Sequence, residues 1–134
     1  MKKFQLLILL LLSSLFSFSQ QFNNCPNVKG IFVRINNPPV FNGSLQQYFD
    51  STLNNAFDSY EGSISLNVLI DSSGKSCCMN ITGSDSRLLS VKIKQAIDAM
   101  PVWKPALQHI RPVNFSARIS LNRFDRVLKV VYYN

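Results

Sequence analysis

The sequence predicts a small α+β domain in which two helices pack on one face of an antiparallel sheet. Two segments repeat apolar residues at helical spacing, and others alternate apolar and polar residues, in the order strand, helix, hairpin, helix, strand. The outer strand positions are polar and need no second layer, so both helices are expected on the same face. With 134 residues, 46% of them hydrophobic and 16% charged, the chain has room for one small core and is too apolar to be wholly disordered.

The N-terminus has the pattern of a secretory signal peptide. Lys2 and Lys3 precede an apolar run that begins at Leu6, and residues 17–19 (SFS) supply the small residues of a cleavage site. The run is shorter than the roughly 20 apolar residues of a spanning helix. We therefore expect cleavage after Ser19 rather than a membrane anchor, and an exported protein. Removal of the two lysines lowers the formal net charge from +7 to +5, with twelve basic and seven acidic residues left.

Three cysteines remain after this cleavage, and an oxidising compartment permits a disulfide. Cys77 and Cys78 are neighbours on a predicted strand, where their side chains point to opposite faces, so they are poor partners for each other. Two alternatives stay open, namely a bridge from Cys25 to Cys77 or Cys78, and three unpaired thiols. A zinc site is not expected, because His109 is the only histidine and there is no second close cysteine pair.

The first half of the domain is predicted as a strand followed by a helix. After a polar lead at residues 20–28, alternating apolar residues indicate a strand from Ile31 to Ile35. Ser44 is a candidate N-cap, and the helical stripe that follows it is expected to end near Asp58.

A hairpin comes next, because the period returns to two from Ser63 onward and residues 71–74 (DSSG) have the composition of a tight turn. Its inward-facing residues are expected to be Ile64, Leu66, Val68 and Ile70 on the first strand and Cys77, Met79 and Ile81 on the second.

A second helix and a final strand complete the predicted fold. The helix is capped within residues 83–86, and its stripe begins at Leu89 and stops at Pro101. The following prolines are expected to preclude regular structure up to Val113, while Trp103 must be buried. The last strand spans residues 113–121.

Several motifs in this order resemble the C-terminal domain of TonB, the energy transducer of Gram-negative envelopes, in the form common in Bacteroidetes-type proteins. The resemblance covers about residues 31–124 and rests on residues 39–43 (PVFNG), the turn at 71–75, residues 100–106 (MPVWKPA) and the Pro-Val pair at 112–113. The chain departs from the family pattern at Ser44, where a second glycine is usual, and at residues 57–58, where Tyr-Pro is usual. The motif and core residues are Pro39, Phe41, Gly43, Gly74, Met100, Pro101, Trp103, Pro105 and Ala106.

The resemblance implies a domain that binds a partner protein in the Gram-negative periplasm, and cleavage of the signal peptide would make it a stand-alone secreted domain. Its parts would be a signal peptide (1–19), a flexible lead (20–28), the TonB C-terminal-like domain (29–124) and a β-prone tail (125–134). The family captures an extended segment of an outer-membrane receptor by strand addition and takes part in TonB-dependent transmembrane transport. Unpaired N–H and C=O groups of an edge strand can accept such a segment. The predicted edge strand comprises Val113, Asn114, Phe115, Ser116, Ala117, Arg118, Ile119, Ser120 and Leu121.

Energy transduction itself is not expected from this sequence. A transducer needs a membrane anchor and a long spacer, whereas roughly ten to twenty residues separate the signal region from the first strand. The alternative to a receptor-binding module is a structural or assembly protein that forms a homodimer through the same edge strand. The tail residues 127–133 (VLKVVYY) are strongly β-prone, so we expect them to fold back over that strand.

Catalysis and nucleic-acid binding are not expected. His109 has no nucleophile motif or carboxylate partner in the sequence, and there is no glycine-rich phosphate loop, so neither an enzyme nor a cofactor is predicted. The basic residues, such as Lys29, Lys75 and Lys104, are scattered along the sequence rather than clustered.

Overall fold

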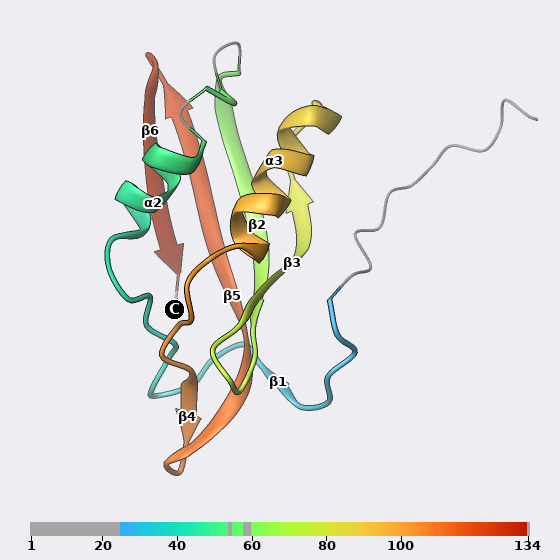
Figure 1. Ribbon diagram of the computed structural model, residues 1–134, viewed down its shortest axis with the longest axis vertical. Coiled ribbons are helices and arrows are strands. Elements are labelled where there is room, and N and C mark those ends of the chain that lie inside the picture. The colour runs from blue at the N-terminus through green and yellow to red at the C-terminus, as the bar shows by residue number, and fades with distance from the viewer. Residues whose placement is uncertain (1–24, 54, 58–59, 134) are drawn as a thin grey trace, which may run out of the picture.

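A computed structural model describes residues 25–53, 55–57 and 60–133. The predicted signal peptide and residues 20–24 of the lead lie outside the described residues. The described elements are β1 (Ile31–Phe32), α2 (Leu45–Thr52), β2 (Gly62–Ile70), β3 (Ser76–Thr82), α3 (Arg87–Asp98), β4 (Ala106–Gln108), β5 (Arg111–Phe124) and β6 (Val127–Tyr133) (Figure 1). The predicted α+β class is confirmed.

The long strand β5 is the centre of the sheet. The main strand order is β1-β5-β2-β3, and β4 and β6 also pair with β5. The pairs that β5 forms with β2, β4 and β6 are antiparallel, as is β2–β3, whereas β1 runs parallel to β5. The expectation of a purely antiparallel sheet is therefore wrong. No hairpin joins β1 to β5, so no turn dictates their relative direction.

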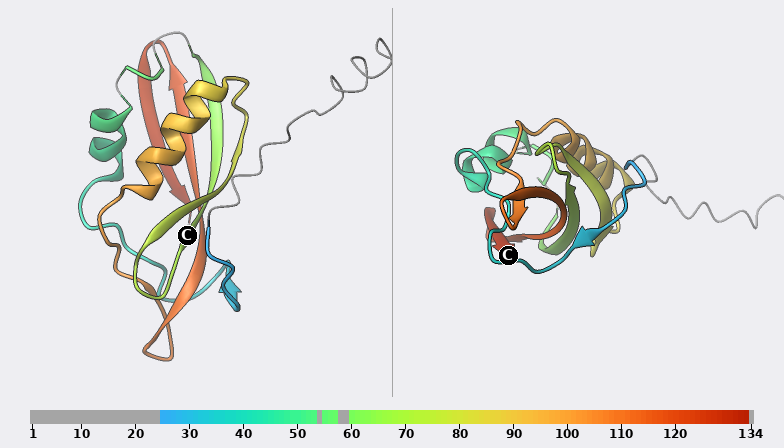
Figure 2. Two further views of the ribbon diagram at one scale, coloured as in Figure 1. Left: turned by 45° about the vertical axis from the view of Figure 1, so that its right-hand side comes forward. Right: turned by 90° about the horizontal axis from the view of Figure 1, so that it is seen from below.

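Both helices lie on the same face of the sheet, as the sequence predicts. In Figures 1 and 2, α2 lies over β6 and α3 lies over β2 and β3. The hydroxyl of Ser44 accepts the N–H of Gln47 at the start of α2, and Ser86 accepts the N–H of Leu89 at the start of α3. Both serines are thus N-caps that satisfy a free donor of the first turn.

The first helix is shorter than predicted. It ends at Thr52, with Leu53 as its C-cap, instead of continuing to Asp58. Leu53 and Phe57 are nevertheless buried, because turns after the helix return Phe57 to the core. The apolar spacing therefore predicts which residues are buried after Thr52, but it does not show that the backbone there is helical.

The core fills the space between the helices and the sheet. Trp103 is among the largest fully buried side chains, with Phe49 from α2 and Phe115 from β5. Ring pairs link Trp103 to Phe41 at 5.1 Å and to Tyr132 at 5.8 Å between centroids. The predicted burial of Trp103 is confirmed, and β6 contributes to the same core as the helices.

A β-bulge in β3 inverts the predicted side-chain alternation. Asn67 is paired with Asn80 and Val68 with Cys78, so Met79 is the extra residue of the bulge. Cys78 is consequently buried on the helix side, whereas Cys77 faces away from it and forms a disulfide. The predicted inward positions Cys77 and Met79 are wrong, because one inserted residue exchanges the two faces of a strand.

Segments around the sheet also differ from the prediction. β4 forms between Pro105 and Pro112, where no regular structure was expected, because a three-residue strand at the sheet's margin tolerates flanking prolines. β1 has two residues instead of the expected five, and Asn37 and Val40 form isolated bridges beyond it.

Candidate functional site

The predicted binding strand, residues 113–121, lies within β5, which is not an edge strand in the described fold. One side of β5 pairs with β2 from Phe115 to Arg123. The other side pairs with β4 at residues 111–113, with β1 at 114–115 and with β6 at 118–124. The expectation that this strand is the open edge is wrong, since three separate segments occupy its second side. Peptide binding by the chain stays a prediction.

The tail is the largest of these segments, and its predicted return over the edge strand is confirmed. Asp125 and Arg126 have positive φ angles of 51° and 63° and form the two-residue turn between β5 and β6. Leu128, Val130 and Tyr132 then pack against the core. The tail is thus an integral strand of the sheet, with one face buried.

The outer side of β6 is capped by a side chain of α2. The Nε2 atom of Gln46 donates to the carbonyl of Leu128 at 2.8 Å, and its Oε1 atom accepts the N–H of Val130 at 2.9 Å. These are the bonds that a neighbouring strand would make. The edge that β6 offers is therefore partly occupied.

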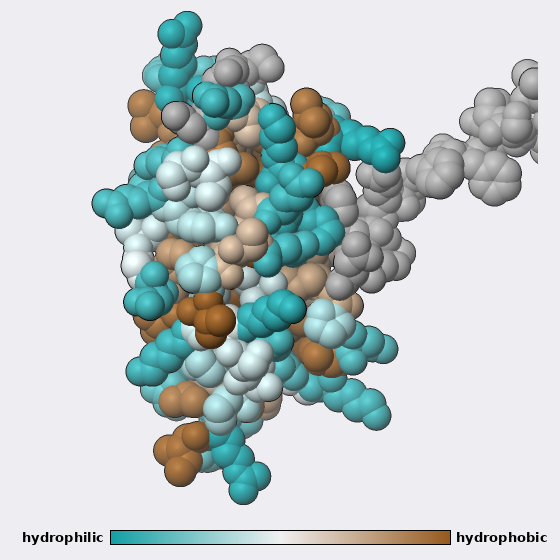
Figure 3. Space-filling view, viewed as in Figure 1, coloured by the Kyte–Doolittle hydropathy of each residue, from teal (hydrophilic) through white to brown (hydrophobic). Residues whose placement is uncertain are grey.

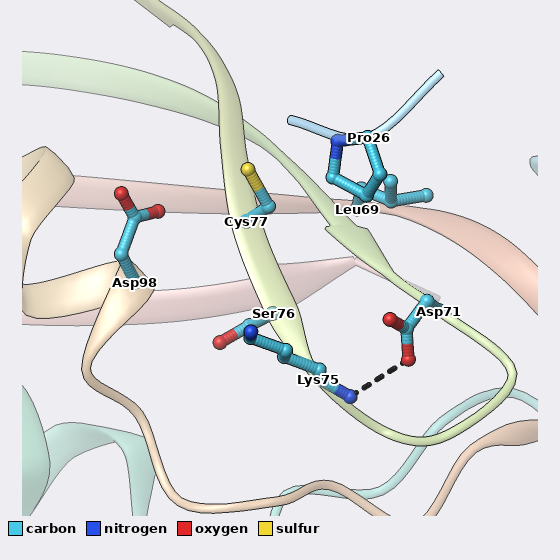
Figure 4. A pocket seen from close by; sticks show the side chains of 7 residues that line it. All are labelled: Pro26, Leu69, Asp71, Lys75, Ser76, Cys77 and Asp98. Atoms are coloured by element: carbon cyan, nitrogen blue, oxygen red, sulfur yellow. Dashed lines mark hydrogen bonds between the residues drawn. The ribbon is translucent and has the colours of Figure 1, made fainter. Parts of the chain in front are cut away.

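The outer side of β3 is different, because no strand pairs with it among the described residues. The backbone N–H of Cys78 donates to the Asp98 carboxylate at 3.1 Å, and Asp98 also pairs with Lys94. A hollow of about 350 Å³ lies beside the start of the strand. The hollow is lined by Pro26, Leu69, Asp71, Lys75, Ser76, Cys77 and Asp98 (Figure 4).

The turn beside this hollow is rigidly bonded. Burial opposes ionisation of Asp71, but hydrogen bonds from Ser73 and from the N–H of Lys75 outweigh it and lower the pKa of this carboxyl. Gly74 has a φ of 86°, and its carbonyl accepts the N–H of Trp103 at 2.8 Å. The predicted family turn and the Pro-Trp motif are therefore in direct contact.

The remaining motif residues differ in their burial. Met100, Trp103 and Ala106 are buried, as are Pro39 and Phe41, whereas Gly43 and Pro101 are exposed and Pro105 is half-buried. The indole Nε1 of Trp103 is buried without a hydrogen-bond partner among the described residues.

The disulfide joins Cys25 to Cys77, which decides between the two pairings that the sequence left open. Cys78 is a buried free thiol, and burial, followed by the nearby Asp98 charge, raises its pKa to about 11. Its thiolate is scarce at neutral pH, so Cys78 is a poor nucleophile for exchange with the neighbouring disulfide. The disulfide also ties the lead to the sheet face opposite the helices (Figure 2), where Pro26 lies beside the buried Leu69 (Figure 4).

His109, the only histidine of the sequence, lies at the tip of a hairpin. This residue lies exposed in the two-residue turn between β4 and β5, with a φ of 48°. The described part of the chain contains no group of three or more His, Cys, Asp or Glu side chains placed to hold a metal ion.

Comparisons of the chain with protein-family models, with curated proteins and with solved structures found no match in any of the three. Within the described residues, neither helix has the length and apolarity needed to cross a membrane.

Proposed function

We propose that the chain is an exported TonB-like binding module that takes up an extended peptide by strand addition. The peptide would come from an outer-membrane receptor or another envelope protein in the Gram-negative periplasm. The motif resemblance between residues 31 and 124 supports the partner class, and the α+β fold with two helices on one sheet face is compatible with it. The chain would bind without transmitting force.

The observation that carries this proposal is the unpaired outer side of β3 with the adjacent hollow. An incoming strand there needs no protein strand to leave. It would displace the bond from the N–H of Cys78 to Asp98 and the contact of the Cys25 Sγ atom, which lies 3.2 Å from the carbonyl oxygen of Cys78. Alternate side chains of the peptide would then enter the hollow. Asp71, Asp98 and Lys75 would be the charged groups nearest to it.

Addition to residues 113–121, the strand that the sequence favours, requires β6 to leave. That strand buries parts of Leu128, Val130 and Tyr132 in the core. Removing such side chains from the core costs several kcal/mol, which is comparable with the total stability of a small domain. A peptide would have to replace those contacts, so the β3 edge is the favoured route.

The proposal can be tested by amide hydrogen exchange on the chain from Gln20 onward, which contains every described residue. The probes are synthetic heptapeptides from the extended plug segments of outer-membrane receptors, each with a control copy N-methylated at alternate residues. We expect slower exchange at residues 76–82 with the unmodified peptides alone, because N-methylation removes the donors of a strand ladder. Unchanged exchange in all strands at millimolar peptide would contradict the proposal.

Two variants sharpen this experiment. Asp98→Ala frees the N–H of Cys78 and should tighten binding several-fold, whereas Lys94→Ala removes the ion pair but keeps the cap. Slower exchange at residues 118–124 with loss of protection in β6 would instead show strand replacement at β5. A dimer whose population rises with protein concentration, measured by light scattering without peptide, would favour the assembly alternative.

A further inference from the structure

One end of the molecule carries an apolar hairpin tip that the fold itself does not explain. The β4–β5 hairpin extends beyond the other elements (Figures 1 and 2). His109 and Ile110 form its two-residue turn, and Ile110 is 91% exposed with a φ of 63°. Two residues with positive φ are typical of such turns, which favour Gly, Asn and Asp.

Ile110 is poorly suited to this position. A β-branched residue is disfavoured in the left-handed region, because its side chain crowds the backbone. The matching turn at the opposite end of β5 has the same backbone form but uses the polar residues Asp125 and Arg126. Because the Ile110 side chain is almost fully exposed, it adds almost nothing to the core. A strained, exposed apolar residue of this kind points to contact with something outside the chain.

Other exposed apolar side chains lie in segments bonded to the same end. Val40 is 55% exposed and pairs with Lys104 through two backbone bonds of 2.9 Å, and Val102 is 65% exposed. Ile31, which pairs with Asn114 of β5, is 42% exposed, and Val33 is 76% exposed. Figure 3 shows brown and teal side chains side by side at this end of the surface. The apolar groups are therefore mixed with hydrophilic ones.

Segments that carry basic residues and are far apart in the sequence are joined at this end. The Asn114 side chain bonds both the carbonyl of Lys29 and the N–H of Ser72, which joins the lead and the β2–β3 turn to the start of β5. The five exposed cations of these segments are Lys29, Arg34, Lys75, Lys104 and Arg111.

Among the described residues, one carboxylate lies with these cations, because Asp71 is bonded within its own turn beside Lys75. Asp98 is paired with Lys94. The other described carboxylates lie in other segments: Asp50 in α2, Glu61 just before β2, Asp85 before α3 and Asp125 in the β5–β6 turn. The end with the apolar tip is thus the cationic end.

We propose that this end binds the surface of an anionic lipid bilayer, with Ile110 inserted among the headgroups and the five cations facing the lipid phosphates. Exposed apolar groups and basic residues at the same end combine the two attractions that hold proteins at such surfaces. A single-stranded nucleic acid would need exposed aromatic side chains for stacking, and the exposed large hydrophobic residues of the segments at this end include no Phe, Tyr or Trp. This inference does not rest on the proposed peptide site on β3, although Lys75 borders both surfaces.

The test is flotation of the chain from Gln20 onward with vesicles of phosphatidylcholine alone or mixed with phosphatidylglycerol. Ile110→Asn keeps the left-handed turn and removes the apolar tip, and Val127→Asn is its control at the opposite hairpin. Lys104→Gln with Arg111→Gln removes two cations, and Arg126→Gln with Lys129→Gln removes two from the other end. Thermal unfolding verifies that each variant is folded.

We expect binding to the anionic vesicles only, and weaker binding as salt screens the charges. Ile110→Asn should weaken vesicle binding about tenfold and leave the melting temperature unchanged or higher. The double substitution Lys104→Gln with Arg111→Gln should weaken vesicle binding about fivefold for each charge removed. Both controls should bind like the parent chain. Equal binding by all variants, equal binding to neutral vesicles, or displacement of the vesicles by duplex DNA at equal charge concentration would overturn the proposal.

Discussion

Gln46 takes the place of a further strand beside Val130. Its carboxamide accepts the N–H of Val130 and donates to the carbonyl of Leu128, so a helix side chain satisfies the outer polar groups of β6 at these two residues. Asp98 of α3 does the same for Cys78 at the opposite edge of the sheet. Each helix therefore both covers the core and protects one edge of the sheet from unwanted pairing.

Removal of the first cap should weaken the domain and open its edge. Gln46→Ala is expected to lower the free energy of unfolding by about 1–2 kcal/mol, because two bonds to the backbone of β6 are lost. The opened edge should also promote self-association. Urea unfolding and light scattering measure the two effects. The exposed neighbour Gln47→Ala is the control, and equal behaviour of the two variants would contradict the capping role.

The last strand should contribute strongly to stability through Tyr132. Its ring packs on Trp103, and its hydroxyl donates to the carbonyl of Pro39 at 3.0 Å. Tyr132→Ala is expected to lower the free energy of unfolding by about 3–4 kcal/mol. Tyr133→Ala changes a side chain that is 51% exposed and should have an effect of less than about 1 kcal/mol. Comparable losses in urea unfolding would refute this assignment.

Deletion of the chain after Phe124 follows the same reasoning. The sequence alone suggests that this deletion opens β5 to partners. The structure instead predicts loss of folding, since Leu128, Val130 and Tyr132 would leave the core together. Near-ultraviolet circular dichroism should lose its fixed aromatic signal. A truncated chain that keeps this signal would show that β6 is dispensable.

Gly74→Ala should be among the most damaging single substitutions. A Cβ at Gly74 would lie 2.0 Å from the carbonyl oxygen of Trp103, at a φ of 86°. Gly30→Ala is the control, because its φ of 68° is similar but no atom lies within 4 Å of the added Cβ. We expect a loss of about 1–2 kcal/mol for Gly30→Ala from the backbone alone and a substantially larger loss for Gly74→Ala. Thermal unfolding of both variants measures the difference.

The two adjacent cysteines should react differently. In the native protein, iodoacetamide at pH 8 should label neither Cys77, which is bridged to Cys25, nor the buried Cys78. In denaturant without reductant, one thiol should be labelled, and peptide mapping should place it at Cys78. Labelling of Cys77 instead of Cys78 would show that Cys25 is bridged to Cys78, which would contradict the bridge to Cys77 and the bulge in β3.

Alkaline pH should destabilise the fold through the same thiol. The pKa of Cys78 is raised to about 11 in the folded state from an unfolded value of 9.0, because burial disfavours the thiolate. The neutral thiol therefore stabilises the fold fully below pH 9, and this contribution falls as the pH rises toward 11. The slope is about 1.4 kcal/mol per pH unit for one group. Cys78→Ala should flatten urea-derived stability between pH 9 and 11, and an unchanged slope would exclude Cys78 as the source.

Local sequence signals predicted the elements whose formation depends on neighbouring residues. Ser44 and Ser86 cap their helices because each hydroxyl meets a donor three residues onward. The β2–β3 hairpin forms because residues 71–74 close its turn, and residues 127–133 return to β5 as their β propensity suggests. The fold class follows from these elements.

The errors occur where partners come from distant parts of the chain. One residue in β3, Met79, inverts the faces on which Cys77 and Cys78 lie, and this bulge leaves no signature in the alternating pattern. The edge status of β5 likewise depends on β1, β4 and β6, which reach it from three separate segments. A sequence pattern indicates that a strand exists but does not show which other strands pair with it.

Periodicity and turn chemistry act over a few residues, so the amino-acid pattern predicts the helices, the central hairpin, the burial of Trp103 and the return of the tail. The bridged cysteine, the open strand edge and the position of the charge depend on contacts between distant segments. Lys29, Lys75 and Lys104 appear scattered along the chain, yet they lie at one end because β5 gathers their segments. The physical reason is that sheet pairing and charge act through space, between segments whose separation the sequence does not encode locally.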